Sequence, residues 1–145
     1  MGQYQLAIFR HAKAQVTDDE MGRPLTSEGV EWAQKVGQDL QVDWDILLCS
    51  PAARAQQTGQ LITGLEPEVI ERLYTNHDPT SEEIDVLYEE LVPFIDKGQC
   101  LIVTHDPLVL PLIARYVGHE VDASGLKAGE GVLIDPQGSL RWIRR

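Results

Sequence analysis

Three apolar segments of the chain each lead into a basic residue or an imidazole. They are residues 4–9 followed by Arg10 and His11, residues 45–50 followed by Arg54, and residues 101–104 followed by His105. Segments of this length and composition are typical of buried strands. Because ligands bind at the carboxyl ends of the strands in an open α/β sheet, we expect these basic and imidazole side chains to meet at one edge of a sheet.

The four side chains match the needs of a phosphoryl group, which carries about two negative charges and three acceptor oxygens. The guanidinium groups of Arg10 and Arg54 can bind those oxygens from two sides. A neutral His can attack phosphorus and form a covalent intermediate, and a second, charged imidazole can stabilise the oxygens during transfer. We also expect a helix that begins at Pro107, capped by Asp106, to direct the positive end of its dipole here.

The elements that must position these residues alternate between strand and helix. Apolar spacing predicts helices from the Thr26 cap to about residue 40, at 52–63, at 81–95 with a kink or break at Pro93, and at 107–117. Strands are predicted at 4–9, 45–49, 68–73 and 99–104, and a hairpin of two short strands at 131–134 and 140–143. This order predicts an α/β fold, a sandwich around a mostly parallel central sheet.

Length and charge limit the class of protein. At 145 residues we expect one domain, residues 1–145. The net charge of −11 argues against binding of nucleic acid or of an anionic membrane. Cys49 and Cys100 form no Cys-x-x-Cys pair and are expected to be buried, reduced thiols. No segment is long enough to span a bilayer and no signal-peptide pattern is present, so the expected location is cytoplasmic.

Four motifs, in order, resemble those of the histidine phosphatase superfamily. They are residues 6–14 around Arg10 and His11, the run Arg23-Pro24-Leu25-Thr26 with Gly29, residues 50–58 around Arg54, and Val103-Thr104-His105. The resemblance covers nearly the whole chain and is greatest to the short, SixA-like phosphohistidine phosphatase branch. It implies a phosphoglycerate mutase-like, three-layer α/β sandwich without a large lid insertion.

The resemblance also implies a role for each matching residue. His11 is the expected nucleophile, Arg10 and Arg54 are the expected phosphoryl ligands, and His105 is expected to stabilise charge during transfer. Arg23 is carried over as a further substrate-binding residue. No metal or other cofactor is expected, because these side chains supply the positive charge that a divalent ion gives other phosphatases.

The general acid is the one role without a matching motif. Larger members of the superfamily supply a Glu or Asp from the region between the second motif and the last His. Asp78, in a polar loop after a predicted strand, is the first candidate. The others are Glu71, Glu82 and Glu83 in the same region, and Asp18 and Asp19 in the loop after His11.

The favoured function is removal of phosphate from phosphohistidine on a partner protein, such as a phosphotransfer domain. Only 50 residues separate Arg54 from His105, and they must supply two helices and a strand, which leaves little chain for a lid. A small substrate usually requires a pocket that buries most of it, whereas a side chain presented by a protein does not. Imidazole, with a pKa of about 6.5, also depends less on a general acid than an alkoxide does.

Other functions compete with this interpretation. A phosphatase for small phosphorylated molecules, such as phosphosugars, is the stronger rival, and a non-catalytic phosphate-binding module is the weaker one. A cysteine phosphatase with Cys49 as nucleophile is set aside, because the segment before Arg54 is too short to wrap a phosphate and contains no Gly. His77 and His119 are interpreted as structural or solvated residues.

Overall fold

Strands and helices alternate along the chain, as its apolar patterns predict. The computed structural model describes residues 4–121 and 125–145. The strands in these residues are β1 (Leu6–Arg10), β2 (Ile46–Cys49), β3 (Glu68–Val69), β4 (Cys100–Thr104), β5 (Gly131–Ile134) and β6 (Leu140–Ile143). The helices are α1 (Ser27–Leu40), α2 (Ala53–Thr63), the short 3₁₀ helix η1 (Glu71–Leu73), α3 (Ser81–Ile95) and α4 (Val109–Val117).

The six strands form one sheet in the order β3-β2-β4-β1-β5-β6. The four strands from β3 to β1 run parallel, and β5 runs antiparallel to both of its neighbours. β1 lies in the middle, with Phe9 opposite Val103 of β4 and Gly131 of β5. The mostly parallel sheet expected from the sequence is therefore confirmed, and the carboxyl ends of β1, β2 and β4 share one edge.

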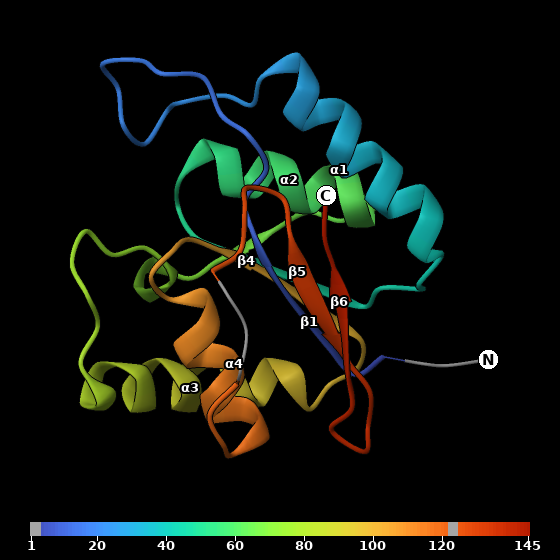
Figure 1. Cartoon of the computed structure of the whole chain (residues 1–145), viewed down its shortest axis with the longest axis vertical. Coiled ribbons are helices and arrows are strands. Elements are labelled where there is room, and N and C mark those ends of the chain that lie inside the picture. The colour runs from blue at the N-terminus through green and yellow to red at the C-terminus, as the bar shows by residue number, and fades with distance from the viewer. Residues whose placement is uncertain (1–3, 122–124) are drawn as a thin grey trace.

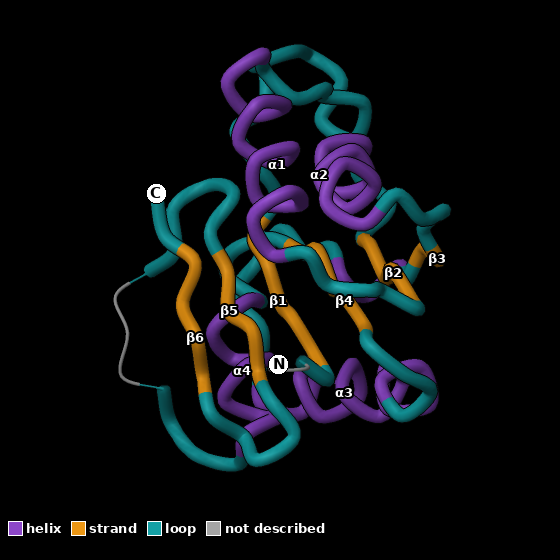
Figure 2. The backbone as a smooth tube through the Cα atoms, turned by 90° about the vertical axis from the view of Figure 1, so that its right-hand side faces the viewer, coloured by secondary structure: helices purple, strands orange, loops and turns teal. Residues whose placement is uncertain are grey.

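Two helices cover each face of the sheet. α1 and α2 lie on one face and α3 and α4 on the other (Figure 1, Figure 2). Successive side chains of a strand point to opposite faces. Leu6 and Ile8 of β1 accordingly join the core beneath α3 and α4, while Ala7 and Phe9 join the core beneath α1 and α2. All four are fully buried, and the three-layer sandwich has an apolar core on each side of the sheet.

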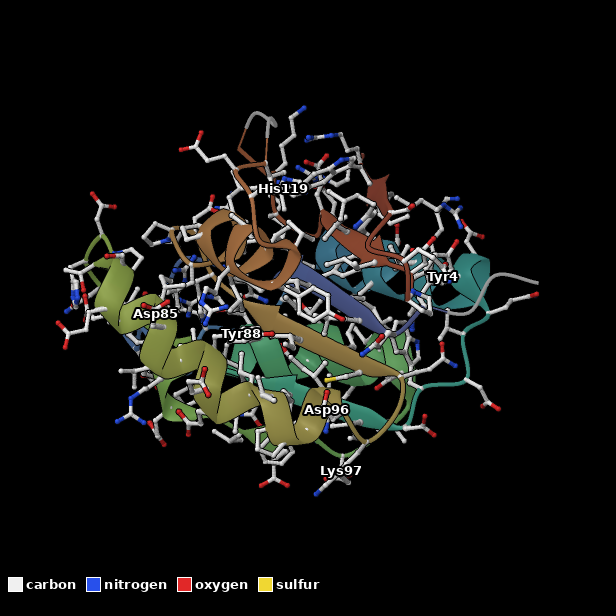
Figure 3. The ribbon with its side chains drawn as sticks, turned by 90° about the horizontal axis from the view of Figure 1, so that it is seen from below. Tyr4, Asp85, Tyr88, Asp96, Lys97 and His119 are labelled. Carbon is white, nitrogen blue, oxygen red and sulfur yellow. The ribbon has the colours of Figure 1, made fainter. Side chains whose placement is uncertain are left out.

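Polar contacts link the two helices on the α3–α4 face. Arg115 of α4 donates from Nε to Asp85 of α3 at 2.8 Å, and its guanidinium lies 4.2 Å from the ring centre of Tyr88. Figure 3 shows Asp85 and Tyr88 along α3, and His119 beyond the end of α4. These contacts hold in place the helix that follows the end of β4.

Local sequence signals set the helix boundaries. Thr26 Oγ1 accepts from Gly29 N at 3.0 Å and caps α1 as expected. Thr80 and Glu83 form a reciprocal capping box at the start of α3. Gly64 ends α2 with a φ of 75°, in the left-handed region that favours glycine. In the part of the chain that the structure describes, no helix combines the length and apolar character needed to cross a bilayer.

The region from β3 to α3 differs from the sequence prediction in two ways. β3 covers only Glu68–Val69, because the chain then turns into η1, where Leu73 N donates to the Ile70 carbonyl at 3.0 Å. α3 continues through Pro93 as a single helix. Pro93 removes one N–H, which would otherwise donate to the Glu89 carbonyl, and only Phe94 and Ile95 follow it in the helix.

The start of α4 also differs from the prediction. The helix begins at Val109 rather than at Pro107. A turn precedes it, in which Leu108 N donates to the His105 carbonyl at 2.8 Å. Asp106 therefore does not cap the helix, and the expected dipole contribution from a helix starting at Pro107 is wrong.

Candidate active site

The sheet edge brings the four predicted residues together. Arg10 ends β1 and His11 follows it, His105 follows β4, and Arg54 lies in the first turn of α2, just after β2. The ring centres of His11 and His105 are 5.0 Å apart. Arg54 Nε lies 3.4 Å from His11 Nε2. Residues separated by almost a hundred positions thus form one cluster of two guanidinium groups and two imidazoles.

His11 is held with one defined ring nitrogen facing Arg54. A carbonyl oxygen only accepts hydrogen bonds, so the 2.7 Å contact between His11 Nδ1 and the Ala12 oxygen places the ring proton on Nδ1. Nε2 then carries a lone pair, toward which Arg54 Nε donates. Burial, together with the positive charges of Arg54 and Arg10, lowers the pKa of His11 to about 4. His11 is therefore neutral at neutral pH, the state in which imidazole is a nucleophile.

His105 is more deeply buried and is held by two neighbours. The residue is 4% exposed, its Nε2 lies 2.6 Å from Ser50 Oγ, and the Tyr74 ring packs edge-on against it at 5.2 Å. Burial, and then the charges of His11 and Arg54, lower the pKa of His105 to about 3. The charged second imidazole expected from the sequence is thus neutral in this structure at neutral pH, although a neutral imidazole still donates one hydrogen bond.

A carboxylate that the sequence analysis did not single out also lies in the site. Glu20, in the loop between β1 and α1, accepts two hydrogen bonds from Arg54, from Nη2 to Oε2 at 2.8 Å and from Nη1 to the backbone oxygen at 2.6 Å. Arg23 Nη1 donates to Oε1 at 3.2 Å, and the Tyr74 hydroxyl donates to Oε2 at 3.2 Å. Glu20 therefore joins Arg54, Arg23 and Tyr74 through one carboxylate.

The ionisation of Glu20 follows from these partners. Burial acts to raise the pKa of Glu20, but the hydrogen bond from Arg23 and the charge of Arg54 outweigh it and hold that pKa below its usual value. Glu20 is a carboxylate, not a carboxylic acid, at neutral pH. Arg23, a substrate-binding residue expected from the family resemblance, thus contacts the cluster through Glu20.

Arg10 is anchored by acceptors from two other segments. Its Nη1 donates to the Leu126 carbonyl at 2.7 Å and lies 3.3 Å from Asp106 Oδ2. Its Nε is buried and has no hydrogen-bond partner among the described residues. Buried donors in proteins are almost always paired, so this N–H is an exception among the described residues.

Buried hydrogen bonds and close packing hold together the segment after β1, helix α1 and helix α2, which position the cluster. Thr58 Oγ1 accepts from Ala12 N at 2.9 Å and donates to the Arg54 carbonyl at 2.7 Å. This side chain joins the segment after β1 to α2. Gly29 lets α1 approach the same segment, because a Cβ there would lie 2.3 Å from the Lys13 carbonyl oxygen.

Among the described residues, no hydrogen bond or ion pair joins the carboxyl groups proposed as general acids to Arg10, His11, Arg54 or His105. Asp78 is exposed in the loop before α3, and in residues 4–121 and 125–145 no hydrogen bond joins its side chain to the four residues. Glu83 caps α3 and pairs with His77 at 3.0 Å. Asp19 accepts from Gly22 N within its own loop. The remaining candidates are Asp18, which is exposed in that loop, Glu71, which begins η1, and Glu82, which borders a neighbouring cavity.

That cavity lies beside the cluster and has a volume of about 340 Å³. It shares Tyr74 with the site, and its other lining residues include Leu108, His77, Thr80, Glu82, Glu83 and Val86. Arg10, His11, Arg54 and His105 do not line it. The reactive nitrogen of His11 therefore lies next to this cavity and not inside it. His119 lies beyond the carboxyl end of α4, whereas His105 precedes the amino end of that helix.

Metal and thiol chemistry have little support in the side chains. Across residues 4–121 and 125–145, no three His, Cys, Asp or Glu side chains are grouped so that they could hold a metal ion. Cys49 and Cys100 are buried free thiols, and burial raises the pKa of each to about 12. Protonated thiols are poor nucleophiles, which agrees with setting the cysteine phosphatase aside.

Comparison with known sequences gives a family. The model of the histidine phosphatase superfamily (branch 1) matches residues 6–77, which include Arg10, His11, Arg23 and Arg54. No curated protein shows a significant match to the sequence.

Comparison with solved structures gives the fold. The protein histidine phosphatase SixA, solved with tungstate, has 22% identity and a TM-score of 0.74, and the match covers 95% of this chain and 93% of that chain. The alpha-ribazole phosphatase from Shigella flexneri has 21% identity and a TM-score of 0.73, covering 97% and 96%. The phosphoserine phosphatase from Entamoeba histolytica, solved with 3-phosphoglyceric acid, has 17% identity and a TM-score of 0.71, covering 94% and 93%. The phosphoglycerate mutase-like fold is confirmed, while the three names point to different substrates.

Proposed function

The chain belongs to the histidine phosphatase superfamily, and from this premise we propose that it removes the phosphoryl group from phosphohistidine on a partner protein. Two features of the cluster support a phosphatase. His11 is neutral, with Nε2 directed at Arg54, and the guanidinium groups of Arg10 and Arg54 flank it. These are the groups that transfer of a dianion to a nitrogen nucleophile requires.

In the first step His11 is the nucleophile. The Nε2 lone pair forms a bond to phosphorus, the bond from phosphorus to the substrate imidazole breaks, and its electron pair stays on the departing imidazole. That imidazole leaves already protonated or takes a proton from water, since its pKa is about 6.5. Arg54 Nε, 3.4 Å from Nε2, lies where it can bind an oxygen of the group in transfer.

In the second step water completes the reaction. The water oxygen bonds to phosphorus, the bond to Nε2 of His11 breaks, and its electron pair returns to the ring. The proton from water passes to the released phosphate or to solvent. In both steps Arg10, Arg54 and an N–H of His105 hold the negative charge on the phosphoryl oxygens.

The observation that carries the substrate assignment is the accessibility of the site. α2, β3, η1, α3 and β4 take up most of the chain between Arg54 and His105, and the longest loop among them, residues 74–80, leaves little length for a lid. The Arg10 side chain is 30% exposed. A small ligand usually requires a pocket that buries most of its surface, whereas a His side chain on a protein brings a surface of its own.

The acidic groups support the same substrate class. An alkoxide leaving group needs a proton donor, which contributes about 10²- to 10⁴-fold in rate. Glu20 is ionised, and Asp78 is an exposed side chain with no hydrogen bond to Arg10, His11, Arg54 or His105 in the described residues. Imidazole needs little such help, so a phosphoramidate suits these groups better than an alkyl phosphate.

A small phosphomonoester is the second candidate, and the cavity of about 340 Å³ beside Tyr74 favours it. A leaving group attached to a phosphoryl group at His11 could extend into that cavity. Similarity to an alpha-ribazole phosphatase and a phosphoserine phosphatase is compatible with this candidate.

The test is a substrate panel at matched concentration: a phosphohistidine-bearing phosphotransfer domain, a phosphosugar and phosphoserine. Variants His11→Ala and, as a matched control, His119→Ala are measured on each. We expect the phosphoprotein to have the highest kcat/KM, and labelled phosphate to be trapped on His11 when the reaction is quenched without acid. Preferred turnover of either small substrate would favour the second candidate, and full activity of His11→Ala would refute the nucleophile.

A further inference from the structure

The carboxylate of Glu20 occupies the donors that a phosphoryl group needs. Both terminal nitrogens of Arg54 donate to Glu20, one to Oε2 at 2.8 Å and one to the backbone oxygen at 2.6 Å. Arg23 and the Tyr74 hydroxyl donate to the same carboxylate. Of the guanidinium nitrogens of Arg54, Nε is the one that faces His11.

The contacts of the Glu20 carboxylate resemble those that a bound anion makes with the side chains of its site. Arg54 is 4% exposed, so its donors are desolvated and require a negatively charged or polar acceptor. The Glu20 carboxylate places Oε2 on Arg54 and Oε1 on Arg23, much as a phosphate can place two of its oxygens on two guanidinium groups. While Glu20 Oε2 holds one N–H of Arg54 Nη2, a phosphoryl oxygen cannot take that N–H, and the negative charge of the carboxylate opposes a phosphoryl dianion at the same guanidinium.

We propose that the carboxylate of Glu20 is an internal competitor for the phosphoryl site. It leaves Nη2 of Arg54 and Nη1 of Arg23 when the substrate binds and returns to them when phosphate departs, while Nη1 of Arg54 keeps its bond to the Glu20 backbone oxygen. The proposal rests on the proposed function, because it takes the cluster at His11 as the phosphoryl site. It assigns to Glu20 control of the affinity for oxyanions, and in particular the release of product.

The loop around Glu20 allows such an exchange without rearrangement of the fold. The neighbouring residue Met21 is fixed, since its carbonyl accepts from Ala53 N, the first residue of α2, at 2.8 Å. The Glu20 side chain itself is 52% exposed. Its carboxylate can rotate into water, where hydration compensates for the lost contacts, while the backbone stays in place.

Return of the carboxylate also has a consequence for turnover. Inorganic phosphate would otherwise remain on two guanidinium groups, because charge-assisted hydrogen bonds of this kind are strong. A competitor built into the chain acts at every turnover and at any dilution, so it weakens binding of the product to the same degree at all enzyme concentrations.

The experiment measures oxyanion binding directly. Isothermal titration with tungstate and with inorganic phosphate is carried out on the wild type, on Glu20→Gln, and on Glu31→Gln, an exposed carboxylate of α1 that controls for the change in net charge. Arg54→Ala tests that the ion binds at the cluster. We expect Glu20→Gln to bind both ions on the order of threefold to tenfold more tightly, with a matching fall in the inhibition constant of phosphate, while Glu31→Gln stays near the wild type.

The outcomes separate this role from the proposed function. Equal affinities in the wild type, Glu20→Gln and Glu31→Gln, with binding lost in Arg54→Ala, would overturn the role of Glu20 and leave the phosphoryl site standing. A lower kcat in Glu20→Gln without tighter binding would also overturn it, since that result identifies a proton-transfer group. Absence of oxyanion binding in both the wild type and Glu20→Gln would count against the phosphoryl site itself.

Discussion

Two buried, neutral imidazoles make the stability of this protein depend on pH. In the unfolded chain a His has a pKa of about 6.5, whereas in the folded protein the pKa is about 4 for His11 and about 3 for His105. Because both folded values are lowered, the unfolded chain binds protons that the folded chain cannot bind. The free energy of unfolding is therefore greatest above the unfolded value and decreases as the pH falls from about 6.5 toward the folded values.

The size of the effect follows from these shifts. Between about pH 7.5 and pH 5, each His should remove on the order of 2 kcal/mol from the free energy of unfolding, and the two together on the order of 4 kcal/mol. Carboxylates with a lowered pKa, such as Glu20 and Glu130, act in the same direction but only at lower pH. Their stabilisation is lost below about pH 4.5, so the interval above pH 5 isolates the two imidazoles.

Urea unfolding followed by tryptophan fluorescence at several pH values measures this effect. The variants His11→Asn and His105→Asn each remove one titrating group and should each reduce the pH-dependent loss by about half. His119→Asn, at the far end of α4, should retain all of it. A wild-type free energy that changes by less than about 1 kcal/mol over this range, or a loss that neither substitution reduces, would refute the assignment of two neutral buried imidazoles.

Two further predictions concern the supports of the site and its source of charge. Thr58→Val removes the acceptor of Ala12 N and should cost about 1–3 kcal/mol, or about 3–9 °C in Tm, and reduce kcat. The control Thr63→Val removes a similar bond to the Gly59 carbonyl farther along α2 and should leave kcat unchanged. A thermal scan measures Tm and a rate assay measures kcat for both variants. Equal losses of activity in the two variants would contradict a specific role for Thr58. Treatment with EDTA should leave the rate unchanged, because Arg10 and Arg54 supply the positive charge that a metal ion gives other phosphatases; activity lost on chelation and restored by a divalent ion would overturn this.

Much of the fold could be predicted because its signals are local. Thr26 and Gly64 mark helix ends by their own chemistry, and the hairpin strands at 131–134 and 140–143 were predicted with the bounds that the structure has. The juxtaposition of Arg10, His11, Arg54 and His105 could be predicted as well, since a parallel sheet collects the ends of its strands at one edge.

The parts of the site that could not be predicted depend on the path of loops. Glu20 reaches Arg54 because the loop after β1 folds back onto the start of α2, and no periodic pattern records that path. Its position near Arg23, after two Asp residues, offered only a weak signal. Tyr74 reaches His105 because η1 ends just before it, in a segment that the sequence favoured as a strand and loop. The start of α4 depends on a turn in which Asp106 pairs with Arg10 instead of capping the helix.

The central position of β1 has a consequence for the order in which the chain acquires its site during synthesis. β1 is synthesised before both of its partners, β4 at residues 100–104 and β5 at residues 131–134. A nascent chain that ends before β5 already contains Arg10, His11, Arg54 and His105, but one side of the strand that carries the first two has no partner. Because contacts between distant residues form late in folding, we expect the site to be completed only after both partners of β1, β4 and then β5, have been synthesised.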